Sequence, residues 1–307
     1  MQIDEKIVHI AIAFDQNYLD PFEVLLSSLL INNGNHVCHL HLIAPDLSQE
    51  RKGAIIRRIK DQKWSVIFYE FSDVRLNQFT LGTSWTKAAY YRLYFPLLIS
   101  EEVTKLIYLD TDTLVVGDIM KLYSIDMGNY PLAAVYDNYV KTQPLIGITH
   151  EGEYFNSGVL LIDLKKWRTQ GISELVFEYL LKFPERIRFV DQCGLNAVLK
   201  DNWKCLDPKF NLLYTYVPNE ATKREIKKFI KDKIIVHFTL QRPWNMLCKS
   251  RLRFLYFDYL KLSGTRNHIY TDFSYKKIPV WIMIRLKEMY FDAPQTQFIW
   301  RALKQIF

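Results

Sequence analysis

Two aspartates directly follow an apolar run that suits a buried strand. Leu106–Leu109 is that run, and Asp110 and Asp112 come next, separated by one threonine. If the chain stays extended there, side chains two residues apart point to one side, so both carboxylates can face the same ligand. Close carboxylates raise each other's pKa unless a cation lies between them, and charged oxygen ligands suit Mg²⁺ or Mn²⁺. Because the pattern is short, the alternative stays open that Asp110 caps a loop and Asp112 is solvated.

Strands and helices alternate along the part of the chain that surrounds these aspartates. Apolar runs predict strands at 7–14, 38–44, 65–71, 106–116, 131–137, 158–164 and 234–238. Helical spacing predicts helices at 21–33, 49–60, 84–98, 173–182 and 191–199. Asp20, Pro21 and Glu23 fit the N-cap, N1 and N3 positions of the first helix. This alternation predicts an α/β fold with a mostly parallel sheet that is covered on both faces.

Polar side chains follow two of the predicted strands. Asp15 and Asn17 come after the first strand, and Asp110 and Asp112 come after the fourth. Sheets of this class place their ligand sites beyond the carboxyl ends of the strands. We therefore expect the two pairs to converge on one crevice.

The excess positive charge lies in the last fifth of the chain. Residues 246–307 hold 11 Lys/Arg and 4 Asp/Glu, a net of +7, whereas the preceding 245 residues hold 29 of each and net to zero. The same segment carries thirteen aromatic residues, and 249–262 and 296–307 have amphipathic spacing. The run 278–284 is apolar but shorter than the ~20 residues that cross a bilayer.

These features predict a helical, basic and aromatic appendage at 246–307 that follows a larger domain at 1–245. Contact with an anionic membrane surface suits such helices, and packing of the aromatics on the larger domain is the alternative. Nucleic acid is not an expected partner, because no recognition motif accompanies the charge. The four cysteines form no C-x-x-C pair and no basic leader opens the chain, so we expect reduced thiols in a cytoplasmic protein, peripheral on the inner membrane face.

Several segments resemble glycosyltransferase family 8, the retaining glucosyl- and galactosyltransferases that use nucleotide sugars. "YLDTDTLV" (108–115) resembles the D-x-D signature of that family. Matching segments occur in the family's order over roughly residues 7–245: AFDQNY (13–18), AAYYRLYFPLL (88–98), YFNSGVLLIDLKKWR (154–168), DQCGLN (191–196) and HFTLQRPW (237–244). The resemblance implies the GT-A fold, a Rossmann-like α/β domain with a mixed sheet.

The resemblance also implies the ligands of a site. Asp110, Asp112 and His237 match metal ligands, with Mn²⁺ the usual ion and Mg²⁺ an alternative. Contacts to the UDP-sugar are implied for Ala13, Asp15, Asn17, Trp85, Arg92, Asp110, Thr111, Asp112, Asn156, Ser157 and Arg242. Within this group Asp15 and Asn17 match uracil contacts, Trp85 lies under the base, and Arg92 reaches the donor sugar.

Gln192, Asp191 and Asp137 are the implied catalytic residues, with Gln192 under the anomeric carbon. Retention by double displacement needs a carboxylate nucleophile, and an amide is a poor one. We therefore favour front-face attack, in which the leaving phosphate oxygen takes the acceptor proton. Asp191 ranks second, as a covalent nucleophile.

Plainer interpretations of these residues also stand. Without the family, Arg92 would be a helix-surface charge, Trp85 a core side chain, and His237 an ordinary histidine at a strand end. Asn156 would be a turn residue, and Asp191 would be the N-cap of the following helix.

Two departures from the family pattern bear on activity. Cys193 stands where the family often has an acidic residue. The usual H-[FY]-x-G-x-x-K-P-W loop is here HFTLQRPW, which lacks the glycine, is one residue shorter, and has Arg242 for lysine. Because of these changes, the alternative stays open that the protein is a catalytically silent family member, which binds a sugar nucleotide or glycan and acts as a partner or scaffold. Metal-dependent nucleotidyl transfer, which also uses paired carboxylates, is a further alternative. The chain lacks the glycine-rich nucleotide loop that would match it.

The favoured prediction is a metal-dependent retaining glycosyltransferase. It would move glucose or galactose from a UDP-sugar to a glycan acceptor, lipopolysaccharide or another surface glycan, including lipid-linked ones. The loop at 138–153 is expected to close over donor or acceptor.

Overall fold

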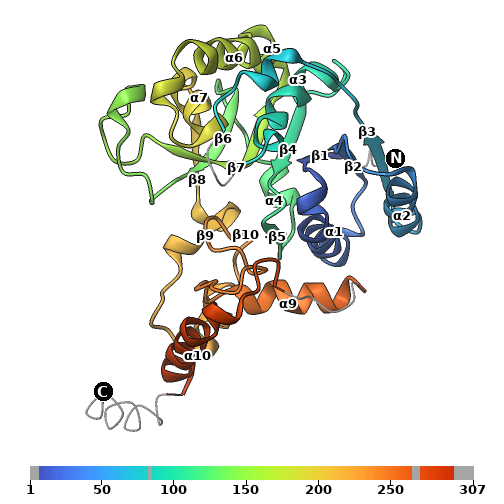
Figure 1. The fold of residues 1–307 in the computed structure, drawn as a ribbon. Helices are drawn as coiled ribbons and strands as arrows, with labels where there is room; N and C mark the ends of the chain where they lie inside the picture. The colour runs from blue at the N-terminus through green and yellow to red at the C-terminus, as the bar shows by residue number, and fades with distance from the viewer. Residues whose placement is uncertain (1–6, 82–84, 265–269, 294–307) are drawn as a thin grey trace.

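The structure is a computed structural model that describes residues 7–81, 85–264 and 270–293. Within these ranges the main sheet has the strand order β3-β2-β1-β4-β7-β6-β8 (Figure 1). Its strands are β1 (Val8–Ala13), β2 (Cys38–Ile43), β3 (Trp64–Phe68), β4 (Lys105–Leu109), β6 (Leu132–Tyr136), β7 (Phe155–Asp163) and β8 (Lys204–Leu206). β7 runs antiparallel to its neighbours β4 and β6, and the other pairs are parallel. The predicted mixed, mostly parallel α/β sheet is confirmed.

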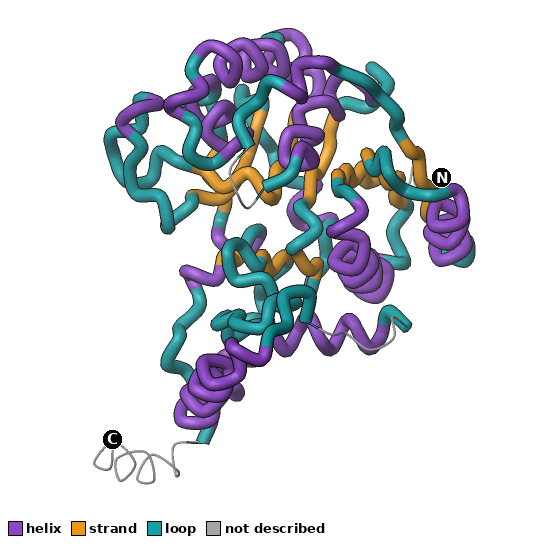
Figure 2. The backbone as a smooth tube through the Cα atoms, viewed as in Figure 1, coloured by secondary structure: helices purple, strands orange, loops and turns teal. Residues whose placement is uncertain are grey.

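Helices cover both faces of this sheet, as Figure 2 shows. On one face lie α1 (Leu19–Asn33), α2 (Gln49–Ile59) and α4 (Met120–Tyr123). The other face carries the 3₁₀ helix η3 (Lys87–Tyr94), α3 (Phe95–Leu98), α5 (Leu164–Thr169), α6 (Ile172–Lys182) and α7 (Val190–Val198). Alternate residues of β1 enter the two cores, Ile10 on the first face and Ala11 on the second. Short 3₁₀ segments join the elements: η1 (Gln16–Tyr18), η2 (Val74–Asn77), η4 (Pro144–Ile146), η5 (Pro184–Arg186), η6 (Pro208–Phe210), η7 (Tyr214–Tyr216) and η8 (Tyr275–Lys277).

A second, small sheet divides the strand that the sequence predicted as continuous over 106–116. After β4 the chain turns, with Thr113 N–H donating to the Asp110 carbonyl at 3.1 Å. It then enters β5 (Thr113–Val115), which pairs antiparallel with β10 (Ile235–His237), itself parallel to β9 (Leu212–Leu213). The single-strand prediction was wrong because the two halves pair in different sheets, and the polar residues Asp110, Thr111 and Asp112 between them form the turn.

Two helix predictions also need correction. The segment predicted as a helix over 84–98 is η3 followed by α3, and Pro96 lies in the first turn of α3. α1 begins at Leu19, so Asp20 lies inside the first turn and is not its N-cap. The reason is that η1, whose N-cap is Asp15, runs directly into α1.

The C-terminal segment holds α9 (Arg253–Leu262) and α10 (Ile278–Asp292), and α8 (Lys223–Phe229) precedes it. Figure 1 shows α9 and α10 at the end of the molecule opposite α5 and α6. α9 packs on α1: Tyr256 is buried in one cluster with Val24 and Leu114. The alternative of packing on the catalytic part therefore holds for α9, and the division at 245/246 stays a prediction. The predicted amphipathic segment 296–307 lies outside the described residues.

Within the described ranges, no helix is long and apolar enough to cross a membrane.

Candidate active site

A pocket of ≈ 350 Å³ lies beyond the carboxyl ends of β1 and β4. Its lining includes most of the predicted site residues: Ala13, Trp85, Arg92, Asp110, Thr111, Asp112, Asp137, Asn156, Ser157, Asp191, Gln192, His237 and Arg242. Asp15 and Asn17 are not part of it. The Asp15 carboxylate instead accepts the Asn17 backbone N–H at 2.9 Å and caps η1. The expected convergence of the two polar pairs, like the contact of this pair with uracil, stays a prediction.

Three side chains in this pocket can hold a metal ion. Ligand atoms of Asp110, Asp112 and His237 all lie within 4.8 Å of one another. The aspartates meet because the chain turns between β4 and β5, not because it is extended as we expected. Gly158 in β7 leaves the room: a Cβ there would lie 2.7 Å from Asp110 Oδ2 and 2.9 Å from His237 Nε2. Two carboxylates and one imidazole suit Mn²⁺ or Mg²⁺.

Hydrogen bonds fix which ring nitrogen of His237 is free. The Asn211 amide nitrogen donates to Asn156 Oδ1 at 2.9 Å, so Asn211 Oδ1 accepts from His237 Nδ1–H at 3.0 Å. This leaves the lone pair of His237 Nε2 3.0 Å from Asp112 Oδ1. Two acceptors at that distance need a cation or a proton between them. Burial raises the pKa of Asp112, but positive charge on a protonated His237 and on Arg242 outweighs burial and lowers it.

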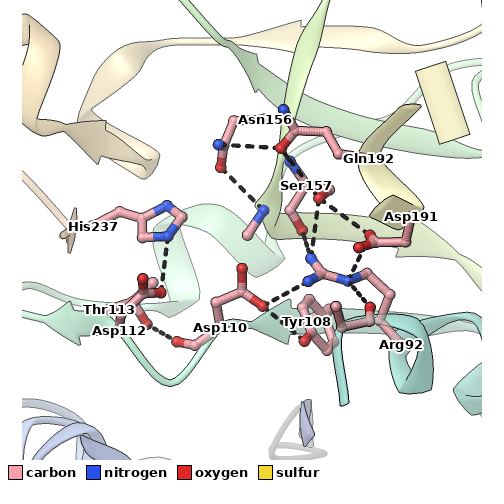
Figure 3. A network of polar contacts seen from close by, with 12 residues as sticks. Arg92, Tyr108, Asp110, Asp112, Thr113, Asn156, Ser157, Asp191, Gln192 and His237 are labelled. Carbon is pink, nitrogen blue, oxygen red and sulfur yellow. Dashed lines mark hydrogen bonds and ion pairs between the residues drawn. The ribbon is translucent and has the colours of Figure 1, made fainter. Parts of the chain in front are cut away.

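Arg92 lies beside Asp110 and ties two carboxylates together (Figure 3). Its Nη2 lies 2.9 Å from Asp110 Oδ1 and its Nε lies 2.9 Å from Asp191 Oδ2, while Nη1 donates to Ser157. Only 6% of the residue is exposed, and the guanidinium lies 4.5 Å from the Tyr108 ring centroid. The interpretation as a helix-surface charge is wrong, because the guanidinium is buried and paired with two carboxylates.

Asp191 is buried beside that arginine. α7 has Phe189 as its N-cap, so the N-cap interpretation of Asp191 is wrong. Val190 before it has φ 32°, an unusual backbone angle for a β-branched residue at a functional site. Burial raises the pKa of Asp191 to about 7, and the Arg92 guanidinium acts in the opposite direction.

An amide network orients Gln192. Its Oε1 accepts the Ser157 backbone N–H at 3.0 Å, and its Nε2 donates to Asp137 Oδ2 at 3.1 Å. Asn156 donates to the same Asp137 oxygen at 3.1 Å, and its Oδ1 accepts from Gly158 N–H at 3.0 Å. These groups satisfy one another, so the Gln192 amide cannot rotate freely. Asn156 belongs to this network, which goes beyond turn chemistry.

Cys193, the first departure from the family pattern, is outside the pocket lining. Its sulfur accepts the Phe189 N–H at 3.2 Å and lies 3.5 Å from the Tyr154 hydroxyl. It packs with Val140 and Ile148 of the 138–153 loop, so it anchors the loop whose residues Tyr139 and Val140 line the pocket. All four cysteines are unpaired, as expected.

The second departure, the loop after His237, does contribute to the lining through Thr239, Leu240 and Arg242. Leu240 has φ +60°, the left-handed conformation that a glycine would adopt readily. The Arg242 guanidinium lies 5.4 Å from the Tyr18 ring centroid. Within the described part of the chain, Arg242 Nε is buried without a hydrogen-bond partner, which leaves it a donor for an anion.

Sequence reasoning did not select three residues of this site: Tyr18, which lines the pocket, Tyr108, whose hydroxyl donates to Asp110 Oδ1 at 2.8 Å, and Asn211. Tyr18 belongs to a segment that was matched to the family. Asn211 gives a weaker signal, a single amide between apolar Phe210 and Leu212. A buried polar side chain in such a run needs a hydrogen-bond partner, and this requirement is the signal by which Asn211 could have been selected from the sequence.

Comparison with known proteins agrees with this geometry. The sequence model of Glycosyl transferase family 8 matches residues 9–248. The chain therefore belongs to glycosyltransferase family 8, and the resemblance seen in its motifs is confirmed.

The chain is also similar to individual proteins and to solved structures. It is 33% identical over 273 residues to General stress protein A of Bacillus subtilis, covering 83% of this chain and 94% of that protein. It is 26% identical over 246 residues to the lipopolysaccharide 1,2-glucosyltransferase of Escherichia coli K12, covering 78% and 73%. The galactosyltransferase LgtC, solved with donor and acceptor sugar analogs, aligns with TM-score 0.72 at 23% identity over 89% of this chain and 99% of its own. The fold is GT-A-like.

Proposed function

We propose that this protein is a metal-dependent retaining glycosyltransferase that moves glucose or galactose from a UDP-sugar to a glycan. The observation that carries the proposal is the group of Asp110, Asp112 and His237 inside the pocket, where the contact between Asp112 and His237 needs a cation or a proton. A divalent cation held there, Mn²⁺ or Mg²⁺, would neutralise charge on a leaving diphosphate.

Residues of the chain would hold the rest of the leaving group. Arg242 offers its unpartnered Nε–H and the remainder of its guanidinium to phosphate oxygens, a geometry that a lysine cannot supply. Asn211 keeps the His237 Nε2 lone pair directed to the ligand side.

The network around Gln192 favours front-face attack. The Gln192 amide is fixed by Ser157 and Asp137, so its oxygen is a fixed dipole beside the reacting carbon and not a nucleophile. Asp191 is 1% exposed and ion-paired with Arg92, which makes it a restrained candidate for covalent attack. The acceptor hydroxyl proton would then pass to the departing phosphate oxygen.

For the acceptor we propose a surface glycan, lipopolysaccharide or a related lipid-linked one, used at the inner face of the cytoplasmic membrane. The support is α10, none of whose described residues is buried. Large apolar side chains along it are exposed: Val280, Ile282, Met283, Leu286 and Met289. Glu288 of α10 pairs with Arg253 of α9 and with Arg285 of its own helix, and Lys276 and Lys277 precede α10. Such a surface suits anionic headgroups.

Vesicle sedimentation tests that partner. Wild type should bind vesicles of anionic phosphatidylglycerol and not those of phosphatidylcholine, and Met283→Glu with Met289→Glu should abolish binding. The pair Leu145→Glu and Leu175→Glu, which changes exposed leucines elsewhere, should leave it intact. Equal binding by both double variants would rule α10 out as the membrane surface.

The transferase itself is tested by UDP release from a panel of UDP-sugars, with Mn²⁺ and with chelator. Metal-dependent release from UDP-glucose or UDP-galactose, with the anomeric configuration retained in the product by NMR, is the expected result. Nucleotidyl transfer would instead release pyrophosphate. Binding of UDP-sugar without release, even with glycan acceptors present, would favour the catalytically silent partner.

A further inference from the structure

Leu240 combines three features that differ from an ordinary surface leucine. It lines the pocket, three residues after His237, yet 49% of it is exposed, so it lies at the mouth. Its φ of +60° is a backbone conformation that leucine rarely adopts. A strained backbone that persists at a binding site points to a use for the side chain.

Hydrogen bonds on both sides of Leu240 hold this conformation. Phe238 N–H donates to the Asp112 carbonyl at 2.9 Å, and Gln241 N–H donates to the Phe238 carbonyl at 3.1 Å. The Gln241 side chain accepts from Lys249 N–H at 2.8 Å. Leu240 is therefore the tip of a tied loop, and its side chain projects from a fixed backbone.

The lining deeper in the pocket is polar, with Asp137, Asp191 and Gln192 around the reacting position. Such a site attracts water, which competes with the acceptor for the anomeric carbon. In hydrolysis a water oxygen bonds to the anomeric carbon, and the bond between that carbon and the diphosphate oxygen breaks. The electron pair leaves with UDP, and the proton that water loses passes to diphosphate or solvent. An apolar group at the mouth lowers the occupancy of water there.

We infer that the Leu240 side chain excludes water from the bound donor and thereby directs the hexose to the acceptor. This inference rests on the proposed function and adds a residue that controls the choice between transfer and hydrolysis. A glycine at this position could keep the backbone but not supply the apolar group.

Two variants separate the side chain from the backbone. Leu240→Asn keeps similar bulk and tolerates a positive φ but is polar, and Leu240→Gly removes the side chain. The matched control is Leu97→Asn, since Leu97 in α3 is 50% exposed and is outside the lining. The readout is UDP released from UDP-hexose with Mn²⁺ and without acceptor. Both Leu240 variants should hydrolyse the donor about 5- to 10-fold faster than wild type, and the control should not.

Thermal unfolding with and without UDP and Mn²⁺ supplies the second readout. Leu240→Gly should melt at least as high as wild type, and all variants should keep the ligand-induced shift. Absence of that shift in wild type would contradict the proposed function. A preserved shift with unchanged hydrolysis in both variants would overturn the role of Leu240 alone, leaving it an exposed leucine of the ordinary kind.

Discussion

His237 Nε2 lies 3.0 Å from Asp112 Oδ1, while Asn211 accepts the proton of the opposite ring nitrogen. The residues come from β10 and from the turn between β4 and β5, 125 positions apart in the sequence. Without a positive charge between them the two lone pairs repel. The fold therefore brings a late strand beside an early turn, where three side chains that could hold a metal ion meet.

Asn211→Ala should weaken metal binding although Asn211 is not itself one of the proposed metal ligands. The His237 ring would lose the acceptor that fixes its tautomer, and loss of such partners commonly costs about 10- to 100-fold in metal affinity. The measurement is the Mn²⁺ concentration that gives half of the UDP-induced thermal shift. Asn219→Ala, at an exposed asparagine, is the control. An unchanged Mn²⁺ requirement would mean that Asn211 only fills space.

Gly158→Ala tests the space around the ligands. The added Cβ would meet Asp110 Oδ2 at 2.7 Å and the His237 ring. Displacing ligands by a fraction of an ångström should lower UDP release by about 100-fold. Gly53→Ala in α2, where the new Cβ meets only the end of Arg57, should leave activity unchanged. Full activity of the Gly158 variant would show that the ligands are not confined as described.

The stability of the protein should fall as the pH drops below 6.5, through His41. His41 Nε2 lies 2.9 Å from His9 Nδ1, and its Nδ1 lies 2.8 Å from the Tyr69 hydroxyl. Burial, with smaller contributions from His9 and His39, lowers the pKa of His41 to about 3. Its pKa in the folded state is depressed below the unfolded value, so between about pH 3 and 6.5 the unfolded chain binds more protons and acid favours unfolding.

From pH 7.5 to pH 5, His41 should account for a loss of about 2 kcal/mol in the free energy of unfolding. Urea unfolding of wild type and His41→Gln at both pH values measures it. The difference between the two proteins isolates His41 from the carboxylates, which both share. Equal losses in both proteins would show that His41 does not titrate on unfolding.

The sequence was sufficient for the elements whose pattern is local. Alternating buried runs and helical spacing predicted the sheet, and strand-end polar residues predicted Asp110 and Asp112. The motif resemblance supplied His237, which no spacing rule connects to the aspartates. It also supplied Gln192, whose fixed orientation depends on β7 and β6 and so on long-range pairing.

The errors have physical causes. Two buried runs flank the turn at 110–112, and their pairing in different sheets is what separates them. Arg92 is buried because it pairs with Asp110 and Asp191, and Asp191 is distant in the sequence. Each error arose because the segment pairs with residues distant in the sequence, and the neighbouring residues do not determine that pairing.

The most direct test of the central claim is Mn²⁺-dependent UDP release by wild type and Asp112→Ala, each supplied with UDP-glucose and UDP-galactose. The account predicts release by wild type from one of these donors, its loss with chelator, and a decrease of about 100-fold or more in the variant, since one of the three proposed metal ligands is removed. Release by Asp112→Ala at the wild-type rate, or release that persists without metal, would contradict it.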